Sequence, residues 1–125
     1  MKILILTLIF SVLTLHTAVG DTWSKNDKVS VFFMCREEKD IMDVALADST
    51  TLQKYLTVLT TKQFDGNCSR IFPPILLSVY SVISGYQDHR KKQMSILKLY
   101  DPNTDLQAGY ILAEGSPANA KETSH

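Results

Sequence analysis

The chain has 125 residues, and its 13 basic and 13 acidic side chains leave it close to neutral at pH 7. This balance lacks the basic excess of a nucleic-acid-binding protein and the polybasic cluster of a protein held at an anionic membrane surface. The length is typical of one domain with a single modest core.

The N-terminus predicts a cleavable signal peptide over residues 1–20. Lys2 precedes an apolar run over residues 3–15, and the small residues Ala18 and Gly20 precede Asp21. The alternative is a membrane anchor, but the run is shorter than the about 20 residues that a span requires. Cleavage removes Lys2 and no acid, so 12 basic residues remain against 13 acidic ones. We therefore expect an exported protein without stable membrane insertion, most consistent with the periplasm and next with the extracellular space.

Two cysteines, Cys35 and Cys68, fit an oxidising compartment and predict one intramolecular disulfide. The bond would close a loop of about 34 residues and stabilise the fold by about 3–4 kcal/mol. A redox pair or a metal site is the alternative. Neither is favoured, because the cysteines lack Cys-x-x-Cys spacing and a neighbouring cluster of ligands.

The first half of the mature chain predicts one strand and two helices. Residues 21–27 form a polar lead-in, with Trp23 as a possible surface anchor. Residues 28–34 alternate as a strand, which places Val29, Val31 and Phe33 on one face. Residues 36–47 then form a short amphipathic helix, whose apolar side chains are Ile41, Val44 and Ala45.

A second helix is expected from an N-cap at Asp48–Ser49 to about Gln63. Its apolar stripe comprises Leu52, Tyr55, Leu56 and Leu59, and its many threonines make it dependent on tertiary packing. Residues 65–67, Asp-Gly-Asn, predict a turn before Cys68.

The second half predicts a three-stranded antiparallel meander. Residues 75–83 are a strand or a buried helix, and the preceding Pro73–Pro74 favours the strand. Residues 88–92 form a charged hairpin tip, and residues 94–100 a second strand. After a turn at residues 101–105, residues 106–113 form a third strand. Residues 115–125 are expected to be a disordered tail.

These elements predict an α+β fold: one strand, two short helices, then the meander, stapled by one disulfide. Residues 28–114 form the single domain. The sheet is expected to be small and strongly curved, or SH3-like, with Gly85 and Gly109 as suitable bend sites.

We find no catalytic, cofactor-binding or metal-binding motif in the sequence. His89 lies in the charged tip, where a solvated surface histidine is expected, and His125 is the last residue. Asp101 and Asp105 fall short of a calcium loop. The carboxylates of the first helix fit its solvated face, although a small hydrolase would have to use them: Glu37, Glu38, Asp40 and Asp43.

Two groups of residues are candidates for contact with a partner protein. The first is the hairpin tip, where a cluster of charge either keeps the sheet edge soluble or meets an acidic partner: His89, Arg90, Lys91 and Lys92. The second is a patch of tyrosines on the sheet, which suits a protein interface: Tyr80, Tyr100 and Tyr110. Asn67-Cys68-Ser69 matches a glycosylation sequon, which we interpret as a chance match.

The sequence thus favours a small exported protein-binding module, such as an inhibitor, an immunity or exclusion factor, or a host-modifying accessory factor. Its partner would be another protein of the cell envelope or extracellular space, and no cofactor is expected. The alternatives are a small secreted hydrolase that uses carboxylates of the helical segment, and a eukaryotic secreted effector.

Overall fold

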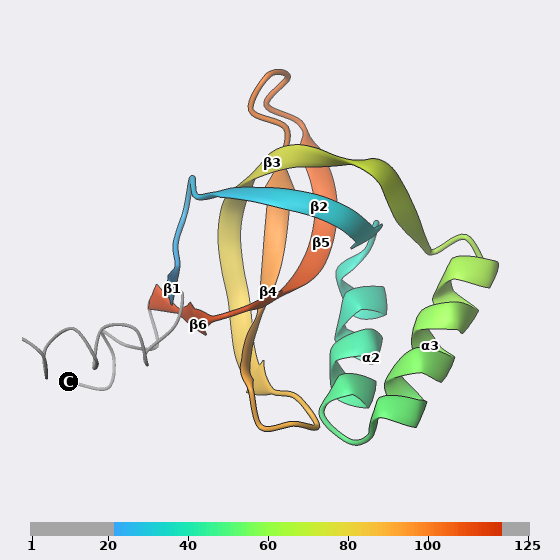
Figure 1. The fold of residues 1–125 in the computed structure, drawn as a ribbon. Helices are drawn as coiled ribbons and strands as arrows, with labels where there is room; N and C mark the ends of the chain where they lie inside the picture. The colour runs from blue at the N-terminus through green and yellow to red at the C-terminus, as the bar shows by residue number, and fades with distance from the viewer. Residues whose placement is uncertain (1–21, 119–125) are drawn as a thin grey trace, which may run out of the picture.

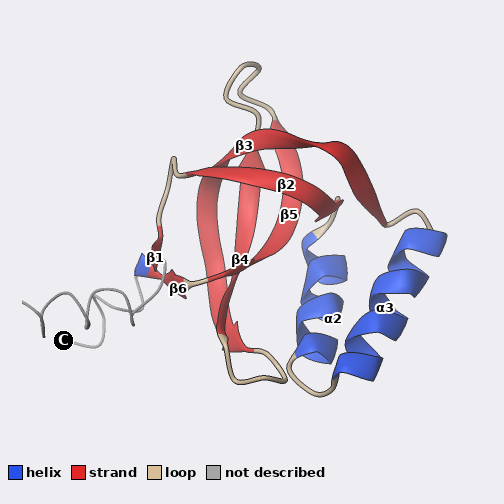
Figure 2. Cartoon of the chain, viewed as in Figure 1, coloured by secondary structure: helices blue, strands red, loops and turns tan. Residues whose placement is uncertain are grey.

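The structure is a computed structural model that describes residues 22–118. The predicted signal peptide and residues 119–125 of the predicted tail lie outside the described residues. The α+β prediction is confirmed, with two helices inserted between strands (Figure 2). The elements in chain order are β1 (Thr22–Trp23), β2 (Lys28–Cys35), α2 (Glu38–Asp48), α3 (Leu52–Phe64), β3 (Cys68–Gln87), β4 (Gln93–Tyr100), β5 (Gln107–Glu114) and β6 (Ser116–Pro117).

The antiparallel strands β2, β3, β4 and β5 curve into a small barrel, and α2 and α3 lie side by side against one side of it (Figure 1). Cys35 and Tyr110 form the one residue pair that joins β2 to β5 among the described residues. Gly109 makes this approach possible, because a Cβ atom there would lie 2.7 Å from the carbonyl oxygen of Cys35. The expectation of a small curved sheet is therefore confirmed.

The barrel has two separate apolar clusters, one on each side of its strands. The inner cluster fills the barrel, whereas the outer one packs between the barrel and the helices. The inner cluster is Val31, Leu77, Val79, Leu97, Leu99 and Ile111. The outer cluster is Cys35, Ile41, Val44, Ala45, Cys68, Ile96 and Tyr110. Alternation along β4 explains the division, because Leu97 faces the interior and Ile96 faces the helices.

A register shift between β2 and β3 makes the observed strands differ from the predicted ones. Val31 pairs with Ile75, but Phe33 pairs with Arg70, so three extra residues of β3 lie opposite Phe32. The prediction that Val29, Val31 and Phe33 share one face is wrong, because beyond the shift Phe33 turns to the helices.

The same shift explains why the strand does not begin at residue 75 as expected. β3 runs without a break through Pro73–Pro74 from Cys68. Proline lacks the N–H that a regular ladder requires, and here it lies where the ladder is interrupted.

The two helices differ in burial. α2 has six buried residues, whereas α3 has none that is fully buried. The predicted stripe of α3 packs only in part: Tyr55 and Leu59 contact the outer cluster, but Leu52 and Leu56 are about half exposed. The N-cap of α3 is Thr51, whose hydroxyl accepts a hydrogen bond from the backbone N–H of Lys54 at 3.1 Å, not Asp48 or Ser49.

The folded unit extends beyond residues 28–114 at both ends. β1 pairs in parallel with β6, and the Trp23 indole N–H donates to the carbonyl oxygen of Glu114 at 2.8 Å. The expected lead-in is therefore part of the structure, and residues 116 and 117 of the expected tail form a strand. Trp23 does anchor this segment, since it packs against the inner cluster.

The predicted disulfide joins Cys35, the last residue of β2, to Cys68, the first residue of β3. It closes the base of the helical pair, because α2 and α3 occupy the chain between the two cysteines. Neither described helix is long and apolar enough to cross a membrane.

Candidate binding surface

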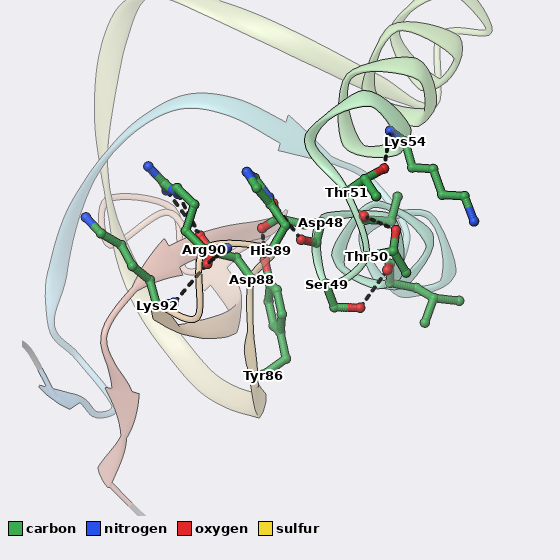
Figure 3. A network of polar contacts seen from close by, with 12 residues as sticks. Asp48, Ser49, Thr50, Thr51, Lys54, Tyr86, Asp88, His89, Arg90 and Lys92 are labelled. Atoms are coloured by element: carbon green, nitrogen blue, oxygen red, sulfur yellow. Dashed lines mark hydrogen bonds and ion pairs between the residues drawn. The ribbon is translucent and has the colours of Figure 1, made fainter.

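The hairpin tip between β3 and β4 packs against the C-terminal end of α2 (Figure 3). The backbone N–H of His89 donates to the carbonyl oxygen of Asp48, the last residue of α2, at 2.7 Å. His89 Nδ1 lies 3.3 Å from the Asp48 carboxylate, and the histidine side chain is only 17% exposed. The expectation of a solvated His89 is therefore wrong, because the tip meets a helix 41 residues away in the sequence.

Asp88 holds the tip in shape from inside. Its Oδ1 atom accepts the backbone N–H groups of Arg90 and Lys92, both at 2.8 Å, and its Oδ2 atom accepts the Arg90 guanidinium at 3.1 Å. Burial acts to raise the pKa of Asp88. The hydrogen bonds from Lys92 and Arg90 outweigh it and hold the pKa below its ordinary value.

The Asp48 carboxylate links three segments of the chain. Its Oδ2 atom accepts the Tyr86 hydroxyl at 2.7 Å, while its Oδ1 atom faces His89. Burial, followed by the hydrogen bond to Asp48, strongly raises the pKa of Tyr86, so the phenol remains a donor at physiological pH. Burial, and then the charge of Asp48, also raises the pKa of Tyr55 on α3.

Asp48, Asp88 and His89 place potential metal ligands within 4.8 Å of one another. Their ligand atoms already have partners, since Asp88 binds the tip backbone and Arg90, and Asp48 binds Tyr86 and faces His89. In the part of the chain that the structure describes, every buried side-chain polar atom has a hydrogen-bond partner. We therefore interpret the cluster as a latch that fastens the hairpin tip to α2.

The helical carboxylates that a hydrolase would use are joined by a lysine. Lys62 of α3 lies 2.8 Å from the buried Asp40 and 2.8 Å from Asp43, both on α2. The hydrogen bonds to Asp40 and Asp43 raise the pKa of Lys62, which keeps it charged. These contacts hold the two helices together, while Glu37 and Glu38 are exposed.

Only two of the three predicted tyrosines come together. The rings of Tyr80 and Tyr100 form an edge-to-face pair with centroids 6.2 Å apart. Tyr110 is buried in the outer cluster beneath the helices. It belongs to the core and not to a surface patch.

Two lysines accompany the tyrosine pair. Lys25 Nζ and Lys98 Nζ each lie 5.2 Å from the centre of the Tyr80 ring, a cation–π arrangement. Neither ammonium group has a carboxylate within ion-pair distance among residues 22–118. With Asp105 and Gln107 from the β5 side they surround a hollow of about 470 Å³.

Further exposed apolar side chains lie along β3 beyond the tyrosine pair. Leu77 and Val79 point into the barrel, so Leu76 and Tyr80 point outward. Ser78 between them is buried, and its hydroxyl accepts a hydrogen bond from the Lys28 ammonium at 3.1 Å. Leu76 is 63% exposed and lies opposite Ser30 of β2. Near the register shift, two phenylalanines are more exposed still. We call these residues the outer sheet face: Phe32, Phe72, Leu76, Tyr80 and Tyr100, with Lys25 and Lys98 beside them.

A larger hollow of about 1020 Å³ lies between α2 and α3. Threonines form much of its lining, together with the exposed Leu46. Two lysines line it: Lys62 already binds Asp40 and Asp43, whereas Lys54 has no ion pair among residues 22–118. This hollow therefore has one such lysine, against the two beside Tyr80.

The predicted tip residues do not join the outer sheet face. His89 and Arg90 serve the latch, and Lys92 lies 3.4 Å from Glu114, so Lys91 is the tip cation without an ion pair among the described residues. Sequence reasoning missed Lys25 and Lys98, although Lys98 follows the strand alternation that places Tyr100 outward.

Phe32 and Phe72 carry no sequence signal for exposure, because apolar strand residues are normally assigned to the core.

Comparison with protein-family models, curated proteins and solved structures found no match to this chain, so the arguments about its function rest on its own geometry.

Proposed function

We propose that the chain is an exported protein-binding module that docks a partner protein on the outer sheet face. The observation that carries this proposal is the exposure of large apolar side chains on one sheet surface: Phe72 is 92% exposed, Phe32 67% and Leu76 63%. Large exposed apolar side chains that gather on one surface are typical of interaction sites, and aromatic residues are enriched in interface cores.

The charges beside this surface define the kind of partner. Lys25 and Lys98 have no ion-pair partner among the described residues, and they flank Tyr80. A partner with an apolar patch bordered by carboxylates would pair with both features. The disulfide and the N-terminal segment support export, and the periplasm is the compartment we propose.

The test is photo-crosslinking in the native host, with a photoreactive amino acid at Leu76. Leu76 lies in the middle of the outer sheet face, so a docked partner should yield a discrete crosslinked adduct. The matched control is the same amino acid at Leu46, which is similarly exposed but lies on α2. An adduct at position 76 and not at 46 supports the proposal.

A second pair of variants tests the energetic role of the surface. Leu76→Ser should weaken the captured complex about tenfold or more, because it removes an exposed apolar anchor without opening the core. Leu46→Ser should leave the complex unchanged. Equal crosslinking at both positions, no adduct at either, or a complex insensitive to Leu76→Ser would refute the proposal.

A further inference from the structure

β2 and β5 close the barrel at one point and diverge from it. Cys35–Tyr110 is their one residue pair in the described chain. Had the antiparallel pairing continued, Phe33 would face Leu112 and Val31 would face Glu114. A groove of about 510 Å³ lies there instead.

The lining of this groove identifies its walls as strand edges. Side chains of a strand alternate between its two faces, so a groove on one face touches every second residue. Here the lining takes consecutive residues from both strands: 29–33 of β2 and 111–114 of β5. The groove therefore runs along the backbones, and both walls present N–H and C=O groups that the β2–β5 ladder does not use. One of these groups, the carbonyl oxygen of Glu114, already accepts the Trp23 indole N–H, so the free edge of β5 lies nearer the closed end.

The remaining lining residues make one side of the groove apolar and place opposite charges towards its two ends. Tyr55 and Leu59 of α3 provide an apolar side. Arg70 pairs with Phe33 near the closed end, and no carboxylate lies within ion-pair distance of it among residues 22–118. Glu114 lies at the open end, beside Lys92.

We propose that this groove is a second binding site, which takes an extended segment of a partner polypeptide. The segment's backbone bonds to the edges of β2 and β5, and alternate apolar side chains contact Tyr55 and Leu59. A carboxylate of the segment pairs with Arg70, which has no ion pair within residues 22–118. This site is distinct from the outer sheet face and does not depend on the proposal made for it.

Selection from a displayed library of random decapeptides on the purified, oxidised protein tests the proposal. The selected peptides should share alternating apolar residues and an acidic residue. Their binding should slow amide hydrogen exchange at residues 29–33 and 111–114. Methylation of alternate peptide nitrogens should weaken binding about tenfold, because it removes the hydrogen-bond donors.

Two exposed threonines of α3 provide a matched pair of variants. Thr60 lines the groove, so Thr60→Arg should block it and weaken binding at least tenfold. Thr57 lies on the same helix but lines the hollow between α2 and α3, so Thr57→Arg should have no effect. Arg70→Gln should weaken binding about two- to fivefold, as expected for an exposed ion pair.

Several results would overturn the groove proposal while leaving the outer sheet face untouched. These are a library that yields no binder, binders that protect no amides in β2 or β5, and binding that survives Thr60→Arg or backbone methylation. Peptides whose binding responds to Leu76→Ser and not to Thr60→Arg would assign peptide recognition to the outer sheet face instead.

Discussion

The barrel interior and the helical layer are stabilised in different ways. The buried residues of the inner cluster are all apolar, whereas α3 has no fully buried residue. α2 packs on the barrel through the buried Ile41 and Val44, whereas α3 relies more on the disulfide, on Lys62 between the helices, and on its partial packing against the outer cluster. Apolar burial thus stabilises the barrel and holds α2 on it, whereas covalent and polar links contribute more to holding α3.

Removing the disulfide should have the largest effect on the difference in stability between the helical layer and the barrel. The cysteines lie 33 residues apart, and the Cys35→Ser/Cys68→Ser double variant should lower the free energy of unfolding by about 4 kcal/mol. Urea unfolding measures the loss, and hydrogen exchange should show α3 opening before β4. Equal stability with and without the bond, or simultaneous opening of both elements, would contradict this difference.

A pair of leucine truncations compares the two regions directly. Leu97 is fully buried in the barrel, so Leu97→Ala should cost about 3 kcal/mol through lost burial and a cavity. Leu56 on α3 is 49% exposed, and Leu56→Ala should cost less than about 1 kcal/mol. Chemical denaturation of both variants gives the two values. Similar losses would show that α3 contributes more apolar packing than its exposure indicates.

Acid titration should reveal the smallest contribution, that of Asp88 in the latch. Its pKa is lower in the folded than in the unfolded protein, so its ionisation stabilises the fold above pH of about 4 and ceases to do so as pH falls through the folded pKa. Asp88→Asn should therefore cost about 1 kcal/mol at pH 7, and less below pH 4. Unfolding curves across pH measure this, with the exposed Asp65→Asn as control. A cost independent of pH would rule out the charge of Asp88 as its origin.

Much of the fold could be predicted from local pattern. The ranges of both helices, of β2, β4 and β5, and the disulfide followed from periodicity, turn signals and the cysteine count. β1 and β6 could not, because two-residue strands some 94 positions apart have no periodic signal. The full length of β3 was missed because Pro73–Pro74 ends a regular strand, whereas here it occupies a register shift set by β2.

Strand alternation predicted the candidate surfaces only where no helix or loop covers the strand. Tyr80 and Tyr100 were found because they point outward from neighbouring strands. Tyr110 was misplaced, because it points out of the barrel on the face that the helices cover, and strand alternation does not reveal that cover. His89 was misjudged because its contact with Asp48 depends on how the hairpin meets α2, and charge density along the chain carries no information about that contact.

The parallel pairing of β1 with β6 gives the chain a common corner for entering and leaving the domain (Figure 1). Thr22 lies opposite Ser116, so whatever is fused to one end of the domain sits beside whatever is fused to the other. Fluorophores attached at the two ends would report proximity only while this corner is intact. Labels at the β1–β6 pair would thus report folding of the domain without any label in the barrel or the helices.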